Sequence, residues 1–425
     1  MCRQSDGQAS PAASACDESR EAKFPWHIGV CDAHCHPTDT MSSIASINNM
    51  RARALTIMAT RSQDQDLVAS VAAKSGIRDR AALEGEHGVQ NTSSLVVPAF
   101  GWHPWFSYQL YDDIDDGTGG GGNATYDPSA AKAEQKATHY SAVLSPTPDE
   151  KFIASLPDPK PLSSFISETR QRVLDAGTAL IGEIGLDKAF RLPWPWNAAD
   201  QSERDGTLTP GGREGRSLSP HHVKMAHQVQ VLKAQLRLAG ELGVAVSVHG
   251  VQAHGVLFDA LASLWKGYEK EVVSRRKQKL VAKGAEDFSS SDEDDEYDWT
   301  TDEVPRPTVK RYKPKPFPPR VCLHSFSGSP QMVSQYLNPA IPLKVYFSFS
   351  TVINLSTAGG ESRFPDVIRA CPDDRLLVES DLHCAGEDMD RLLEDICRKV
   401  CDTKGWSLEE GLQRIRKNYE EFVFG

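Results

Sequence analysis

The chain has 425 residues, of which 39% are hydrophobic and 25% are charged, and its formal net charge is −11. This length fits two or three ordinary domains, or one large α/β barrel with insertions. The negative charge argues against a protein that coats duplex DNA nonspecifically, because such proteins are usually basic. It does not exclude an enzyme that meets nucleic acid only at a cationic, metal-loaded cleft.

The amino-terminal sequence and the cysteines bear on the location of the protein. Residues 1–25 are polar and contain no apolar h-region, so we expect a disordered tail rather than a secretory signal. No window approaches 18 uninterrupted apolar residues, which argues against a transmembrane helix and a membrane partner. The nine cysteines do not resemble a disulfide framework. We therefore predict a cytoplasmic or nuclear protein that is not secreted.

Eight short apolar runs alternate with helical patterns along the chain. Each run is continuous and rich in β-branched or aromatic residues, as is typical of parallel strands covered on both faces. The runs span residues 28–31, 54–59, 95–101, 179–185, 244–249, 321–326, 345–349 and 376–379. The clearest helix is predicted over 224–242, with Ser219 and Pro220 as its start and Gly243 as its end. This alternation predicts an α/β fold, a (β/α)8 TIM barrel.

Four stretches do not fit a compact barrel, namely residues near 62–94, 107–160, 189–220 and 266–319. The last changes from basic to acidic to Pro-rich sequence and cannot bury enough apolar surface to stay ordered. Without these stretches and the tail, roughly 230 residues remain, which is a usual barrel size. We therefore predict a single barrel domain over 26–425 with disordered or loop insertions.

Residues suited to metal binding follow the predicted strands, at the end of a barrel where active sites lie. The first run leads into Asp32-Ala33-His34-Cys35-His36, in which His34 and His36 point to the same side of an extended strand. The other strand ends carry His103, Glu183, His249, His324 and Asp381. One such residue could be a salt-bridge partner or a turn cap. Several at matching positions predict a metal site.

Taken together, the motifs DAHCH, GWHP, GEIGLD, SVHG, HSFSG and ESD resemble the TatD-like family of metal-dependent deoxyribonucleases, which have amidohydrolase-type barrels. A helix motif over 228–239 and the closing stretch 418–424 match as well, so the resemblance spans nearly the whole chain apart from the tail and insertions. The long insertions and their acidic-serine tract resemble a fungal branch of the family.

The resemblance implies a site with two divalent cations, Mg²⁺, Mn²⁺ or Zn²⁺. In that pattern one metal is held by His34, His36 and Asp381, and the other by His249 and His324, while Glu183 bridges both. A bridging carboxylate can hold two cations about 3.5–4 Å apart, as in two-metal phosphoryl hydrolases. Asp381 and Glu183 are the expected catalytic residues, with Asp381 as the general base.

The resemblance also suggests residues around the ligands. His103 is expected to contact a substrate phosphate, although it could instead cap a turn, and Trp102 and Ser325 are further candidates for substrate binding. Trp102 and its aromatic neighbours suit base stacking or ordinary packing, and both possibilities stay open. Asp32 and Asp187 are expected to support the ligands from behind.

The chain departs from the family pattern at two positions. An Arg usually lies two positions after the fifth-strand histidine, and a Pro two positions after the last Asp, whereas this chain has Val251 and His383. Neither position supplies a ligand, so hydrolysis should survive. A missing Arg weakens the grip on phosphate and affects substrate preference.

Three functions remain open. The favoured one is a two-metal phosphodiester hydrolase, a deoxyribonuclease with 3'-5' exonuclease-like action on single-stranded DNA or duplex ends. The second is an interaction protein with little or no catalysis, a partner of a cell-cycle complex that contacts proteins through its insertions. The third is another amidohydrolase-type metal hydrolase. The complete ligand set favours the first.

Overall fold

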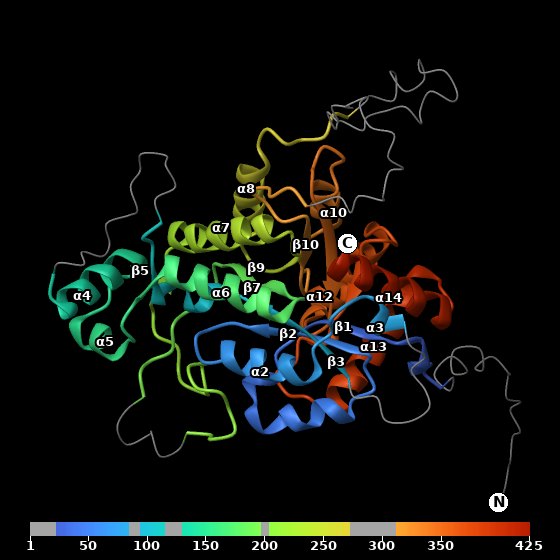
Figure 1. Ribbon diagram of the computed structural model, residues 1–425, viewed down its shortest axis with the longest axis horizontal. Coiled ribbons are helices and arrows are strands. Elements are labelled where there is room, and N and C mark those ends of the chain that lie inside the picture. The colour runs from blue at the N-terminus through green and yellow to red at the C-terminus, as the bar shows by residue number, and fades with distance from the viewer. Residues whose placement is uncertain (1–22, 85–93, 115–129, 197–203, 273–311) are drawn as a thin grey trace, which may run out of the picture.

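Eight parallel strands form one sheet in the computed structural model, which describes residues 23–84, 94–114, 130–196, 204–272 and 312–425 (Figure 1). In their order across the sheet, the strands are β1 (Cys31–Cys35), β2 (Ala54–Ala59), β3 (Leu95–Phe100), β7 (Leu180–Asp187), β9 (Val246–Val251), β10 (Arg320–Leu323), β11 (Lys344–Phe349) and β12 (Leu376–Val378). After β12 the chain returns to β1, since the Asp381 amide donates to the His34 carbonyl over 3.0 Å. The strands thus form a nearly closed (β/α)8 barrel, which confirms the predicted fold class.

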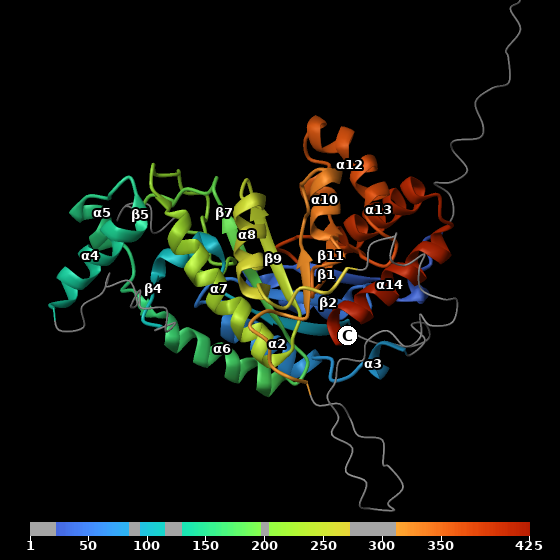
Figure 2. The same cartoon turned by 90° about the horizontal axis from the view of Figure 1, so that it is seen from above.

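Helices follow the strands and cover the outside of this sheet (Figure 2). They are α2 (Gln65–Ser75), α3 (Ala81–Glu84), α6 (Leu162–Ala176), α7 (Met225–Leu242), α8 (His254–Trp265), α10 (Pro330–Tyr336), α11 (Thr351–Asn354), α12 (Ala358–Ala370) and α13 (Glu387–Lys404). Short 3-10 helices are η1 (Trp26–Ile28), η2 (Pro37–Asp39), η3 (Met41–Asn49) and η4 (Pro104–Gln109). Outward strand residues such as Leu55, Ile57 and Val248 pack with Leu232 and Leu236 of α7 in one large apolar core. Burial of each such side chain contributes about 1.5–3 kcal/mol.

The last helix, α14 (Leu408–Phe424), closes the amino-terminal end of the barrel. Its Tyr419 and Phe422 join the inward residues of the strands in a second core cluster. The Tyr419 hydroxyl lies 2.9 Å from Thr56 Oγ1. Arg320, the first residue of β10, donates Nε to the Phe422 carbonyl over 2.7 Å. The opposite end of the barrel, at the carboxyl ends of the strands, is therefore the end left for a site.

Two element boundaries differ from the prediction. The first strand begins where its predicted range ends, because η1 and Gly29, which has φ +90°, turn the chain just before Cys31. Helix α7 begins at Met225 rather than at Ser219 and Pro220. The residues between form β8 (His222–Val223), which pairs antiparallel with β5 (Leu144–Ser145).

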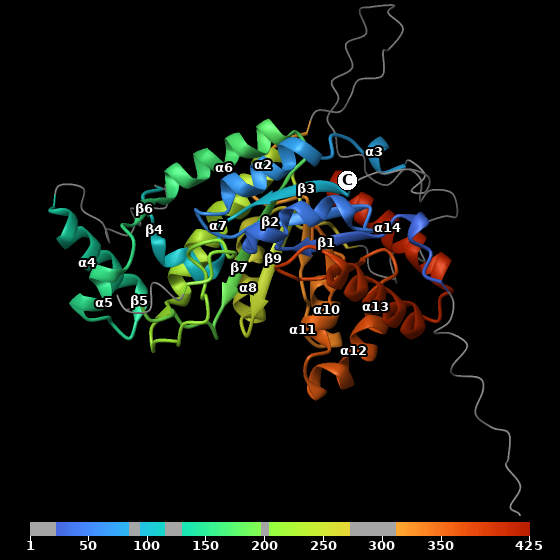
Figure 3. The ribbon, with the colours of Figure 1, turned by 90° about the horizontal axis from the view of Figure 1, so that it is seen from below.

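The predicted insertions contain ordered elements. The stretch 62–94 includes α2 and α3, and α2 follows β2 as a barrel helix does. The stretch 107–160 includes β4 (Leu110–Tyr111), α4 (Lys132–Val143), α5 (Glu150–Ser155) and β6 (Lys160–Pro161). Helices α4 and α5 lie at the end of the molecule opposite α14 in all three views (Figure 3). The expected disorder in 1–25 and 266–319 falls mostly on residues outside the described ranges.

Two sequence-based expectations on location can be compared with the described residues. None of the helices there is long and apolar enough to cross a membrane. The cysteines described are all free, and only Cys384 among them is exposed. Cys35, which separates the two histidines of the first motif, is buried in the large core.

Candidate metal centre

Histidines and carboxylates from five strands converge at the carboxyl end of the barrel. Glu183 of β7 lies at their centre and is 3% exposed. Around it lie His34 on β1, His36 just after β1, His249 on β9, His324 after β10 and Asp381 after β12. The structure thus brings together all six residues that the sequence suggested as ligands.

One oxygen of Glu183 faces the two histidines of the first motif. Its Oε2 lies 3.6 Å from His34 Nε2 and 3.3 Å from His36 Nε2. The two imidazole nitrogens are 3.0 Å apart. Asp381 Oδ1 completes this group at 3.9 Å from His34 Nε2 and 3.6 Å from His36 Nε2. Nitrogen and oxygen atoms at this mutual spacing could hold a divalent cation.

The other oxygen of Glu183 faces a second group. Its Oε1 lies 2.9 Å from His249 Nδ1 and 2.7 Å from His324 Nε2, and these two nitrogens are 3.2 Å apart. Asp187 lies behind His249, with Oδ2 3.1 Å from Nε2. Burial opposes ionisation of Asp187, but hydrogen bonds from His249 and Trp105 outweigh it and lower its pKa to about 2. A carboxylate there favours the proton on Nε2, which leaves Nδ1 free to act as a ligand.

A register irregularity turns the first histidine pair into the barrel. Cys31 and Ala33 belong to the interior cluster, yet Cys35 belongs to the outer core. The pairing of β1 with β2 shifts between Asp32 and Cys35. Because one extra residue reverses the alternation of a strand, His34 and His36 face the interior beyond this point.

Strand β7 contains a second irregularity of this kind. Ile181 and Ile184 both pack in the outer core although they are three positions apart, and the pairing with β9 shifts between them. Glu183 can therefore face the centre. At Gly185, where φ is +150°, an added Cβ would lie 2.1 Å from the His249 carbonyl oxygen. Only glycine fits this close approach of the two strands.

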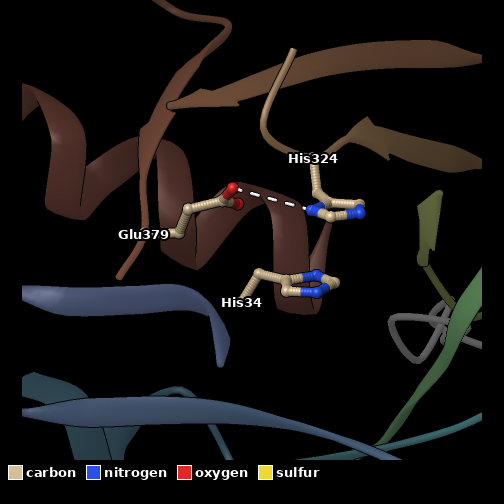
Figure 4. A group of neighbouring side chains, drawn as sticks. All are labelled: His34, His324 and Glu379. Carbon is tan, nitrogen blue, oxygen red and sulfur yellow. Dashed lines mark ion pairs between the residues drawn. The ribbon is translucent and has the colours of Figure 1, made fainter. Parts of the chain in front are cut away.

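Two supporting residues were not predicted. Ser247 places Oγ 2.8 Å from His34 Nδ1. Glu379 places Oε1 3.6 Å from His324 Nδ1 (Figure 4). Figure 4 also shows the rings of His34 and His324 face to face. The centroids of these stacked rings are 3.8 Å apart. The sequence held a signal for both: Ser247 lies two positions before His249, and Glu379 two before Asp381, which is same-face spacing on a strand.

Burial and neighbouring charges set the protonation of the centre. Burial lowers the pKa of His34 to about 3, which keeps this imidazole neutral at neutral pH. Burial acts against protonation of His324 as well, but Glu183 and Glu379 outweigh it and hold its pKa well above the usual value. Burial raises the pKa of Asp381 to about 6. Without metal, the second group therefore holds a proton that a cation must displace.

His103 caps a turn, which is one of the two roles considered for it, and lies close to Glu183. Its Nε2 lies 3.1 Å from Glu183 Oε1, which puts it within reach of the second group. Its Nδ1 accepts a hydrogen bond from the Trp105 amide over 3.2 Å, so it also caps η4. Burial lowers the pKa of His103 to about 4. A neutral His103 beside Glu183 can donate one hydrogen bond from Nε2.

The prediction that Trp102 binds substrate is wrong. Its side chain is 2% exposed, meets Phe165 edge to face, and donates Nε1 to the Phe106 carbonyl over 2.8 Å. It lies in an apolar cluster with Phe165 of α6 and Val231 of α7, on the helix side of the sheet. Trp105, which is 36% exposed, lines the cavity instead.

Ser325 and Asp32 are held by hydrogen bonds within the protein. Ser325 lines the cavity, and its Oγ lies 2.5 Å from Glu379 Oε1 and 3.2 Å from Asp381 Oδ2. Ser325 and Asp381 have φ of +42° and +54°, a strained backbone that is common where side chains are aimed into a site. Asp32 is buried and accepts from Ser380 Oγ over 2.5 Å, which ties β1 to the segment after β12.

A cavity of about 750 Å³ extends from this centre toward the insertion 189–220. Its volume lies in the range of small-ligand sites. The centre contributes His36, His103, Glu183, His249, His324 and Asp381 to the wall, and the insertion contributes Phe190, Leu192, Pro193, Pro195, Gly211, Gly212, Arg213 and Arg216. The insertion is therefore part of the site.

The barrel and its buried histidine–carboxylate clusters are those of a metal-dependent hydrolase. The model of the family described as TatD related DNase matches residues 31–424, and the chain belongs to this family. The chain is 35% identical over 395 residues to the Cut9-interacting protein scn1 of Schizosaccharomyces pombe, covering 93% of this chain and 98% of that protein. It is 23% identical over 351 residues to the uncharacterized deoxyribonuclease YMR262W of Saccharomyces cerevisiae, covering 79% of this chain and 84% of that protein.

A solved structure resembles the chain as well. The TatD homologue YJJV of Escherichia coli aligns over 94% of this chain and 98% of its own, with a TM-score of 0.46 and 15% sequence identity.

Proposed function

We propose that the protein is a two-metal phosphodiester hydrolase, a deoxyribonuclease that acts on the ends of DNA strands. The observation that carries this proposal is the division of the Glu183 carboxylate, whose two oxygens face two separate donor groups. The donors are imidazole nitrogens and carboxylate oxygens, which suit Zn²⁺ and Mn²⁺, and the carboxylates suit Mg²⁺ as well. A bridging carboxylate is the usual way to hold two such cations close together.

The ligands follow from these groups. His34, His36 and Asp381 would hold one cation and His249 and His324 the other, with Glu183 between them. When bound, the cations supply a reactive water and neutralise charge on the phosphate. Every other function would come from side chains of the protein.

Asp381 and His103 have the remaining tasks. Asp381 Oδ1 faces the first donor group, and the residue lines the cavity, so it can accept the proton of the attacking water. His103 is neutral and lines the cavity beside the second donor group, so its single donor, Nε2–H, which faces Glu183 Oε1, could serve a phosphate oxygen instead. This division of tasks is that of in-line phosphodiester hydrolysis.

The cavity supports action on strand ends. Its volume suits a small ligand or a short piece of single strand, and the insertion forms part of its wall. The wall would obstruct the approach of a continuous duplex to the metal centre. We therefore propose exonuclease action, with 3'-5' polarity carried over from the family resemblance and with single strands or frayed duplex ends as substrate.

The test uses purified protein with end-labelled single-stranded and duplex DNA, in Mg²⁺, Mn²⁺, Zn²⁺ or EDTA. We expect metal-dependent release of nucleotides and its loss in Glu183→Ala, because this carboxylate would serve both cations. Glu168→Ala, which changes an exposed carboxylate on α6, is the matched control. Activity that persists in EDTA and in Glu183→Ala would refute the mechanism, and the position of the label reports polarity.

A second candidate function is protein binding. It is favoured by the fission-yeast relative, which is 35% identical over nearly its whole length and is named for its interaction with Cut9. Binding of this chain to a Cut9-like partner, unchanged in Glu183→Ala, would support a scaffold role that is independent of catalysis. Loss of binding in Glu183→Ala would mean that partner binding depends on the intact metal centre. Either function fits a cytoplasmic or nuclear location.

A further inference from the structure

The loop over 204–218 is fixed to the rim of the barrel. Arg61, which follows β2 and is 3% exposed, donates Nε to the Pro210 carbonyl over 3.1 Å and Nη2 to the Thr209 carbonyl over 3.3 Å. The Thr209 amide donates to the Asp39 carbonyl over 2.8 Å. The Arg61 contacts are buried or partly buried, so the loop has a defined position relative to the strand ends.

The two arms of the insertion also pair with each other. The Trp194 amide donates to the Ser217 carbonyl over 2.9 Å, and the Ser219 amide donates to the Leu192 carbonyl over 2.7 Å. Phe190, at the start of the insertion, stacks on Trp105 with centroids 4.6 Å apart. This wall of the cavity is therefore built from ordered backbone.

Two arginines of this loop line the cavity. Arg216 donates Nη2 to the Gly212 carbonyl over 2.6 Å and Nη1 to the Trp194 carbonyl over 3.3 Å. Arg213 donates Nε to the Arg216 carbonyl over 3.0 Å. Backbone carbonyls thus orient both guanidinium groups without neutralising them.

No carboxylate pairs with these arginines within the described ranges. Glu214, which lies between them in sequence, pairs with Arg204 over 2.5 Å and accepts the Gly211 amide over 2.9 Å. The third arginine of the cavity, Arg61, is paired with Asp39 at 2.8 Å and Asp64 at 3.2 Å. Arg213 and Arg216 are therefore the cations of this wall that remain available to an anion.

We propose that Arg213 and Arg216 form an anion subsite for a phosphate of the substrate strand other than the phosphate that is cleaved. The inference rests on the proposed nuclease function and adds a second point of contact. Guanidinium groups suit this task because their N–H donors match the spacing of phosphate oxygens. Val251, which follows the metal ligand His249 on β9, lines the cavity but carries no charge. The positive charge on this side of the cavity therefore comes from the loop arginines.

The test compares two substrates that differ in their number of phosphates. Bis(p-nitrophenyl) phosphate has one and reports the metal centre alone, whereas a single-stranded thymidine pentanucleotide has several. For Arg213→Ala combined with Arg216→Ala, we expect KM for the pentanucleotide to rise about tenfold or more, which corresponds to the loss of one or two charged hydrogen bonds. KM for bis(p-nitrophenyl) phosphate should change little, because this substrate has no second phosphate for the arginines to bind.

Further variants separate charge from loop structure. Arg213→Lys and Arg216→Lys keep the charge and should recover part of the affinity, and Arg369→Ala, an exposed change on α12, is the control. An equal loss for both substrates would mean that the arginines only support the loop, and would overturn the subsite. An unchanged KM for the pentanucleotide would overturn it too.

A failure of the proposed function can be told apart from a failure of the subsite. If the unaltered protein cleaves neither substrate, the nuclease function fails. Binding of a fluorescent pentanucleotide in EDTA, followed by anisotropy, then tests the subsite by itself. Equal binding by the unaltered protein and the double variant would overturn it, whereas binding about tenfold weaker in the variant would support it.

Discussion

The metal centre and the wall made by the loop 204–218 are built in different ways. At the centre, side chains from five strands are almost fully buried and contact one another, so each donor atom is held by its neighbours. On the wall, backbone carbonyls hold two arginines that face the cavity. A change in the centre should therefore affect chemistry and metal binding together, whereas a change on the wall should affect substrate affinity alone.

Among the residues around Glu183, the largest expected effect is at Asp381. Asp381→Asn removes the proposed base and one ligand oxygen, and we expect kcat to fall about 10²–10⁴-fold. Asp366→Asn, an exposed change on α12, is the control. A kcat within tenfold of the unaltered protein would show that the centre works without this carboxylate.

The next effect tests the layer behind the ligands. Asp187→Asn removes the charge that holds His249 in orientation, and we expect metal affinity to fall about 10–100-fold. Excess metal should restore much of the rate, because the ligands themselves remain. Asp175→Asn on α6 serves for comparison. A rate that excess metal cannot restore would place Asp187 in the chemistry itself.

The pH dependence of metal binding tests the protonation of the centre. The pKa of His324 is raised in the metal-free protein, so below that pKa a cation competes with a proton. Affinity should therefore rise with pH, by at most about tenfold per pH unit for each proton displaced, and fall as pH decreases. Titration calorimetry in buffers of different ionisation enthalpy measures both the affinity and the proton release. Affinity that does not change with pH would contradict the assignment.

The smallest effect concerns Trp105, which joins the two regions. Its Nε1 donates to Asp187 Oδ2 over 2.6 Å, and its ring stacks on Phe190 of the insertion. Trp105→Phe keeps the stacking and removes the donor, at a cost of about 1 kcal/mol, or about fivefold in rate. Trp105→Ala should in addition raise KM for the pentanucleotide. An equal KM in both variants would show that the Trp105 ring does not contribute to substrate binding.

Much of this architecture could be predicted because parallel strands in a barrel are continuous apolar runs. All eight runs coincide with strands, or in the first case adjoin one, and the six proposed ligands meet because the strands are parallel and end on one face. The first strand was misplaced since its polar residues, Asp32 and His34, are satisfied by Ser380 after β12 and by Ser247 of β9.

The remaining features depend on contacts that are distant in sequence. Gln235 of α7 fixes the position of the Trp102 backbone. Its side-chain oxygen accepts a hydrogen bond from the Trp102 amide, and its side-chain nitrogen donates one to the Trp102 carbonyl. The loop arginines reach the cavity because Arg61, about 150 residues earlier, anchors their loop. Local sequence patterns do not reveal either of these long-range contacts.

The two register irregularities impose a requirement on chain length. In β1 and β7 the histidine pair and Glu183 face the barrel interior because the pairing shifts between Asp32 and Cys35 and between Ile181 and Ile184. Deleting one residue there would turn these side chains toward the helices, even if every remaining residue stayed the same. Substitutions at these strands can accumulate one at a time, but insertions and deletions cannot. The loop 204–218 is held by hydrogen bonds to the rim and to the other arm of the insertion rather than by strand register, so a change in its length would reshape the cavity wall without turning any ligand away from the centre.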